Sequence, residues 1–101
     1  MKYIGYWEYS PTKITTVIEK FRQMTADREN MEEKYAKIIF GPYRLFGESR
    51  GFSIFETEDP EKLANIANFY APEVKWEFIP IHDAKDYLKP SMAEIYLNLK
   101  K

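Results

Sequence analysis

The first thirty residues combine a strand-like and a helix-like hydrophobic pattern. Residues 2–9 carry β-branched and aromatic side chains on both faces, which predicts a central strand covered above and below. Ser10 and Pro11 then suit the N-cap and first position of a helix. Four apolar residues follow at helical spacing: Ile14, Val17, Ile18 and Phe21. This pattern predicts a helix from Pro11 into the mid-twenties, and the charged residues 25–34, which lack Gly and Pro, could either continue it or fray.

The second half predicts three further strands and one helix. Residues 37–46 read as a strand that Gly41 and Pro42 interrupt, so this strand belongs at an edge or contains a bulge. Residues 52–57 predict the third strand, and Asp59 and Pro60 then begin a helix. Its buried stripe is predicted to be Leu63, Ile66, Ala67 and Tyr70. Residues 74–81 alternate as a fourth strand, in which Pro80 again favours an edge.

The resulting order, βαββαβ, contains a weak internal repeat of two strand–helix–strand halves. We therefore predict an α+β, ferredoxin-like fold with a four-stranded antiparallel sheet in the order 4-1-3-2. Right-handed crossovers place the first and third strands side by side in the middle, and we expect these two to run parallel. The prolines then fall on both edge strands.

The C-terminal residues follow a different pattern. After Pro90, apolar residues recur at i, i+3, i+4 and i+7: Met92, Ile95, Tyr96 and Leu99. Such a short amphipathic helix is unstable alone, so it is expected to dock on its own domain or on a partner. We therefore divide the chain into a ferredoxin-like domain over 1–82 and a C-terminal helical extension over 83–101.

Composition adds a prediction about assembly and excludes several partners. Aromatic residues make up 17% of the chain, and two helices can cover only one face of the sheet, so a homodimer is expected to cover the other. Fifteen Lys and Arg balance sixteen Asp and Glu, which argues against nucleic acid and membrane partners. The absence of Cys, of a signal-like start and of a long apolar run predicts a cytoplasmic protein.

Three segments together resemble a known group of proteins: YIGYWEYSP, RGFSIFETEDPEKL and VKWEFIPIHDA. They are similar to a family of small uncharacterised proteins in the dimeric α/β-barrel superfamily, over most of residues 1–84. The resemblance implies a homodimer in which two four-stranded sheets face each other as a barrel, with the helices outside. It implies no activity, because wider relatives of the fold include monooxygenases, isomerases, haem-handling enzymes and ligand-sensing modules.

A second resemblance concerns RNA-recognition domains. RGFSIF is similar to their third-strand motif, and Tyr3 and Phe52 could stack on bases. However, Ile54 stands where a second aromatic residue is usual, and the balanced charge does not suit a phosphate binder. We therefore expect no nucleic-acid binding.

Two carboxylates are the first candidates for chemistry. Glu8 and Glu56 each lie near the C-terminal end of a predicted central strand. If the two strands bring them together, their pKa values would separate and they could act as an acid and base pair. Alternatively, Glu56 bonds backbone amides at the helix start, and Glu8 pairs with Lys75 or is solvated.

Other candidate residues surround the strands. His82 is the only histidine and could act as a general base or an axial ligand, or simply lie at the surface. Tyr43, Arg44 and Arg50 flank the second hairpin, where an arginine could hold a carboxylate or phosphate, although solvated hairpin charges have the same pattern. Trp7 could wall an apolar pocket, together with Tyr9, Trp76 and Phe78, unless these rings are plain core. The sequence shows no recognisable metal site and implies no cofactor.

Three functional hypotheses follow. The first is a homodimeric α/β barrel that binds a small apolar or aromatic ligand. The second is a cofactor-independent monooxygenase or isomerase, with Glu56 or His82 as base and Arg44 or Arg50 as anion holder. The third is a structural or regulatory dimer without a ligand. A cavity of a few hundred Å³ between sheet and helices would separate the first two from the third.

Overall fold

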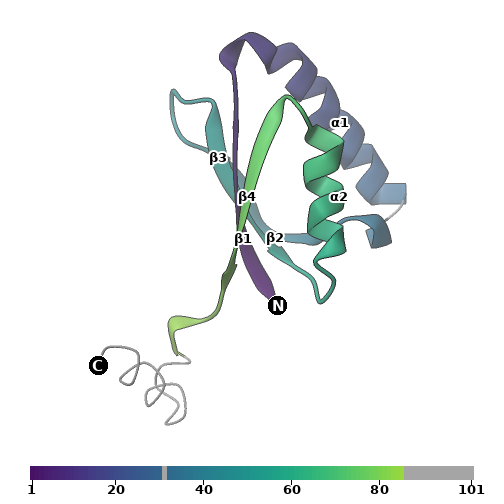
Figure 1. Ribbon diagram of the computed structural model, residues 1–101, viewed down its shortest axis with the longest axis vertical. Coiled ribbons are helices and arrows are strands. Elements are labelled where there is room, and N and C mark those ends of the chain that lie inside the picture. The colour runs from purple at the N-terminus through teal and green to yellow at the C-terminus, as the bar shows by residue number, and fades with distance from the viewer. Residues whose placement is uncertain (31, 86–101) are drawn as a thin grey trace.

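The computed structural model describes residues 1–30 and 32–85 and has the βαββαβ order (Figure 1). Its elements are β1 (Lys2–Tyr9), α1 (Ile14–Asn30), β2 (Lys37–Arg44), β3 (Arg50–Glu56), α2 (Glu61–Tyr70) and β4 (Val74–Ile81), with short 3₁₀ turns η1 (Pro11–Lys13) and η2 (Glu32–Lys34). Helix α1 extends beyond the mid-twenties, so the charged residues 25–30 are helical. The four apolar residues of the predicted tail helix, Met92, Ile95, Tyr96 and Leu99, lie outside the described residues.

The four strands form one sheet in the order β2-β3-β1-β4, which is 4-1-3-2 when counted from the β4 edge. All neighbouring strands pair antiparallel, including β1 and β3. The expectation that these two central strands run parallel is therefore wrong. The reason is the hairpin between β2 and β3: the crossover through α1 returns β2 in the direction of β1, and the hairpin then reverses β3.

Strand β2 combines both features that its Gly-Pro pair predicted. It lies at the edge of the sheet, and its register with β3 shifts on either side of Phe40. Gly41 has a φ of +90° within this irregular segment, a conformation that side-chain-bearing residues rarely adopt. Pro42 follows it, where a missing amide hydrogen does not interrupt a central ladder.

Both helices cover the same face of the sheet (Figure 1). The helix-facing strand positions alternate along β1, β3 and β4 and include Trp7, Phe55 and Trp76. From α2, the predicted stripe is buried at Leu63, Ile66 and Tyr70 and partly buried at Ala67. From α1, only Met24 is buried. Helix α2 therefore closes the core, whereas α1 contributes little to it.

The helices and loops of the described residues leave the opposite face of the sheet open. An apolar row crosses all four strands in register, from Ile79 through Ile4 and Ile54 to Phe40. A second row, from Glu77 through Tyr6 and Phe52 to Tyr43, lies beside it. Tyr6, Phe40, Tyr43 and Ile79 are exposed. Residues 1–30 and 32–85 therefore cover only one of the two apolar faces that the sequence of β1 shows.

An ion pair ties α1 to the segment before β4. Lys20 Nζ donates to Glu73 Oε2 at 2.6 Å and to the carbonyl oxygen of Ala71 at 2.9 Å. The hydrogen bond from Lys20 is the main reason that the pKa of Glu73 is lowered from its usual value.

This pair predicts a defined pH dependence of stability. Because the folded pKa of Glu73 is depressed, the stabilisation is present above the unfolded pKa and is lost as pH falls through the folded value. Glu73→Gln should therefore lower the melting temperature at neutral pH and have little effect in acid, below the folded pKa. Thermal unfolding across a pH series measures the difference, with Glu19→Gln, exposed on α1, as the control. An equal decrease in melting temperature at every pH would show that the Lys20–Glu73 ion pair is not the cause.

Candidate functional site

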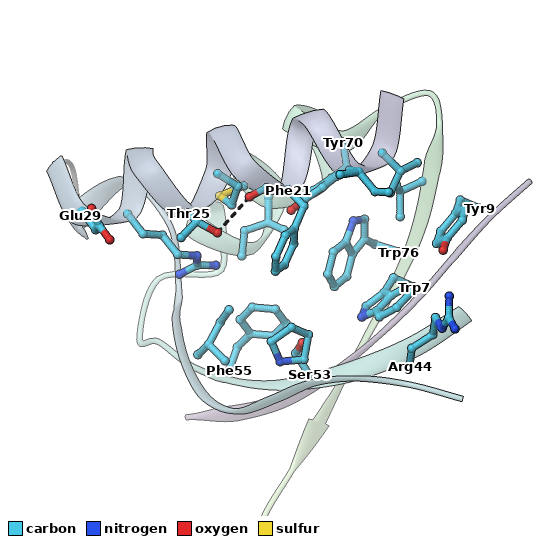
Figure 2. A pocket seen from close by; sticks show the side chains of 18 residues that line it. Trp7, Tyr9, Phe21, Thr25, Glu29, Arg44, Ser53, Phe55, Tyr70 and Trp76 are labelled. Atoms are coloured by element: carbon cyan, nitrogen blue, oxygen red, sulfur yellow. Dashed lines mark hydrogen bonds between the residues drawn. The ribbon is translucent and has the colours of Figure 1, made fainter. Parts of the chain in front are cut away.

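A cavity of about 620 Å³ separates α1 from the sheet (Figure 2). Its lining comes from α1, α2 and the helix-facing side of all four strands. The main apolar contributors are Val17, Ile18, Phe21 and Met24 of α1, Ile66 and Tyr70 of α2, and Trp7, Ile38, Phe55, Val74 and Trp76 of the sheet. The cavity is therefore an apolar space inside the layer where a core would otherwise close.

The apolar stripe of α1 faces this cavity. Ile18 and Phe21 keep 44% and 47% of their surface exposed, although both lie on the side of α1 that lines the cavity. Their spacing predicts ordinary helix packing, but the sheet does not reach them. Large apolar side chains left open on the inner face of a helix are the usual lining of a small-molecule site.

Aromatic rings form the sheet side of the cavity. The rings of Phe55 and Trp76 meet edge to face at 5.9 Å, and those of Tyr70 and Trp76 lie 5.7 Å apart. Trp7 stacks on Tyr9 at 6.1 Å. These contacts hold the rings in fixed positions. Both tryptophans of the chain, Trp7 and Trp76, line the cavity, and both also border a hollow on the opposite face of the sheet.

A few polar groups lie in the apolar lining. Trp76 Nε1 and Arg28 Nε are buried and have no hydrogen-bond partner among residues 1–30 and 32–85. Ser53 is almost fully buried, and burial raises the pKa of Tyr70 to about 12, so its phenol stays protonated at neutral pH. Buried donors without partners are rare in folded proteins, which makes them candidates for ligand contacts.

Among the described charged side chains of the lining, Arg28 is partly buried, whereas Glu29 and Arg44 are exposed. Arg28 Nη1 donates to the carbonyl oxygen of Ala36 at 2.5 Å, and its guanidinium lies 5.7 Å from the ring of Tyr35 and 6.0 Å from that of Phe55. Burial lowers the pKa of Arg28, but an arginine remains cationic at neutral pH. Within residues 1–30 and 32–85, no salt bridge joins it to a carboxylate.

Two of the residues predicted to bind a ligand line the cavity, namely Trp7 and Arg44. Tyr43 does not, because it packs against Phe40 and Phe52 on the open face, with ring centroids 5.0 and 6.0 Å away. Glu8 and Arg50 line a separate hollow of about 540 Å³ on that open face. The Arg50 guanidinium is already engaged by Glu48, at 3.0 Å.

Glu8 and Glu56 lie at opposite ends of the sheet. In the antiparallel register Glu8 faces Arg50, whereas Glu56 faces Lys2. The acid and base pair considered from the sequence therefore does not form, because that hypothesis depended on parallel central strands. Each carboxylate instead lies between two cations in a cross-strand row: Lys75, Glu8 and Arg50 at one end, and Lys2, Glu56 and Lys37 at the other.

The remaining sequence candidates lie outside the cavity. Glu56 is exposed, and the start of α2 is capped by Asp59, whose Oδ1 accepts from the Glu61 amide at 3.0 Å. His82 is exposed directly after β4 and is not among the cavity residues. The strand-to-helix corner at Glu56 is thus ordered by Asp59.

Sequence reasoning missed Arg28, Ser53 and Tyr70 as site residues. A signal for Arg28 was present, since it follows Phe21 by seven residues and Met24 by four and so falls on the same helix face. The charged composition of residues 25–34 concealed this periodicity. Ser53 and Tyr70 read as an ordinary strand and helix position, and no local pattern marks them.

The chain belongs to a family of proteins that share a domain of unknown function, DUF3303, whose model matches residues 1–93. The match continues past residue 82, where the C-terminal extension was predicted to begin. No curated protein matches the chain. Among the described residues, no helix is long and apolar enough to span a membrane, and no group of three His, Cys, Asp or Glu side chains could hold a metal ion.

Proposed function

We propose that this protein binds a small apolar or aromatic molecule in the cavity between α1 and the sheet. The single observation that carries the proposal is the cavity itself, about 620 Å³ with a largely apolar and aromatic lining. That volume lies within the range of pockets that enclose small organic ligands. The rigid ring contacts around Trp76 support binding to a preformed site, which lowers the entropic cost of association.

The proposal assigns binding and not catalysis. Neither Glu56 nor His82 lines the cavity, so the bases considered for a monooxygenase or isomerase have no part in it. Among the described residues, the charged lining side chains are Arg28, Glu29 and Arg44. Arginine is a poor general base because it stays protonated. Glu29 lies apart from the labelled aromatic side chains, at the outer end of α1 (Figure 2).

Binding can be tested with the neutral dye N-phenyl-1-naphthylamine, which fluoresces in apolar surroundings. We expect saturable fluorescence and energy transfer from Trp7 and Trp76, which line the cavity. Because both also border the hollow on the open face, the substitutions that follow assign the site. Val17→Phe, which adds a ring from α1, should weaken dye binding at least about ten-fold by filling the space. The matched control is Thr15→Phe, at an exposed position outside the lining.

Two outcomes would contradict this proposal. One is the absence of saturable dye binding by the folded wild-type protein. The other is equal binding by Val17→Phe and Thr15→Phe, which would place the dye on another surface, such as the open face of the sheet. Circular dichroism checks that both variants are folded, so that a loss of binding is not caused by unfolding.

We further propose that the protein is a homodimer whose two sheets pack face to face. The open face supports this, because its apolar row crosses all four strands and includes Ile4, Ile54 and Phe40. Exposed contiguous apolar surfaces of this kind usually mark interaction sites. The rows centred on Glu8 and Glu56 border the apolar rows at both ends and would form a polar rim around such an interface.

A further inference from the structure

We infer that the cavity selects organic monoacids, with the apolar or aromatic body of the ligand in the cavity and its carboxylate bound to Arg28. This inference rests on the proposed ligand-binding function and names the chemical class of the ligand. It follows from a cation that lines an apolar space without an anionic partner among the described side chains.

The hydrogen bonds of Arg28 leave a vacancy for an acceptor. A guanidinium has five N–H donors, and within the described residues Nη1 of Arg28 donates to the Ala36 carbonyl. Nε is enclosed by protein without a partner there, so we assign the ligand contact to the remaining Nη hydrogens. The Tyr35 hydroxyl, on the ring beside the guanidinium, is also buried and has no partner in the part of the chain that the structure describes. A carboxylate suits such a group because its two oxygens can accept from adjacent guanidinium nitrogens.

The energetics favour an anion at this position over a neutral polar group. Removing a charge from water is unfavourable unless it is paired, and burial already lowers the pKa of Arg28. The aromatic rings of Tyr35 and Phe55 offset part of this penalty through cation–π contacts. An incoming carboxylate would pair the charge in an apolar environment, where the attraction is less screened than at the surface.

The other charged lining residues suit this role less well. Arg44 is exposed, beside Trp7 and away from Glu29 (Figure 2), and a solvated cation gains little from an ion pair. Glu29 is also exposed, and it does not pair with Arg28. Since only Arg28 is both cationic and partly buried in the lining, we expect selectivity for one carboxylate and not for two.

The test compares 2-naphthoic acid with 2-naphthamide, which have nearly the same shape and differ in charge. Equilibrium dialysis at neutral pH measures each compound directly. We expect the wild-type protein to bind the acid at least about ten-fold more tightly than the amide. Arg28→Met replaces the guanidinium with an apolar group on an unbranched side chain, so this variant should bind the acid and the amide with similar affinity. The control Arg22→Gln, exposed on α1 outside the lining, should keep the preference, and Arg44→Gln tests whether the exposed lining cation holds the acid instead.

The outcomes separate this inference from the proposed function. If N-phenyl-1-naphthylamine binds but the acid has no advantage over the amide, the cavity binds ligands and the inference about acids is wrong. If Arg44→Gln alone abolishes the preference, the anion lies at the other end of the cavity and the assignment to Arg28 is wrong. If Arg28→Met fails to fold, the wild-type ratio still decides the ligand class, and Arg28→Lys, expected to show a reduced preference, tests the position.

Discussion

Phe55→Ala should lower the free energy of unfolding by about 3–5 kcal/mol, the usual cost of truncating a fully buried aromatic residue. Phe55 is 1% exposed in the central strand β3, and its ring meets Trp76 at 5.9 Å and Phe78 at 5.8 Å. The ring lies beside the cavity, so its removal would enlarge an existing void that the surrounding backbone cannot close. We therefore expect the loss to fall in the upper part of this range.

Urea denaturation of the two variants Phe55→Ala and Phe46→Ala measures this effect against a matched control. Phe46 is 102% exposed in the turn between β2 and β3, so its truncation should change stability by less than about 0.5 kcal/mol. Similar losses in both variants would contradict the core described here. Because both variants replace Phe with Ala, the difference between their losses of stability reports the burial of the ring and not the loss of an aromatic side chain as such.

The order of the elements was predictable because local signals agreed with one another. Pro11 and Pro60 mark the helix starts, and Pro42 and Pro80 both lie on edge strands, where a missing amide hydrogen is tolerated. The alternation of residues 74–81 gave the limits of β4. The predicted direction of β3 was wrong. Alignment of an internal repeat compares residue types, and it does not show that the hairpin between β2 and β3 reverses the chain.

The candidate site was less predictable because it depends on how far α1 lies from the sheet. The apolar stripe through Ile18 and Phe21 has the same sequence pattern whether it packs on the sheet or faces a cavity. Only the distance between α1 and the sheet distinguishes the two, and this is a tertiary property. Trp7 and Arg44 were identified because large aromatic and cationic residues stand out locally, while Arg28 lies within a uniformly charged stretch.

Ile54→Lys should convert the proposed homodimer into a monomer. Ile54 lies on central strand β3 in the middle of the open face, and its neighbours in register are Ile4 and Phe40. In a single chain, a lysine there can extend into solvent. Between two facing sheets, it would bury a charge without a partner, which is strongly unfavourable. We expect the dimer to weaken at least about a hundred-fold, since one unpaired buried charge typically costs several kcal/mol.

Sedimentation velocity at micromolar concentration tests this result, because the chain mass of 12.1 kDa separates monomer from dimer clearly. The control is Thr15→Lys, which adds the same charge at an exposed position on the helix side. It should remain dimeric, and Ile54→Lys should still bind N-phenyl-1-naphthylamine, since the cavity lies on the opposite face of the sheet. A monomeric wild-type protein would exclude the facing-sheet dimer. A dimer that persists in Ile54→Lys would show that the two chains associate through another surface.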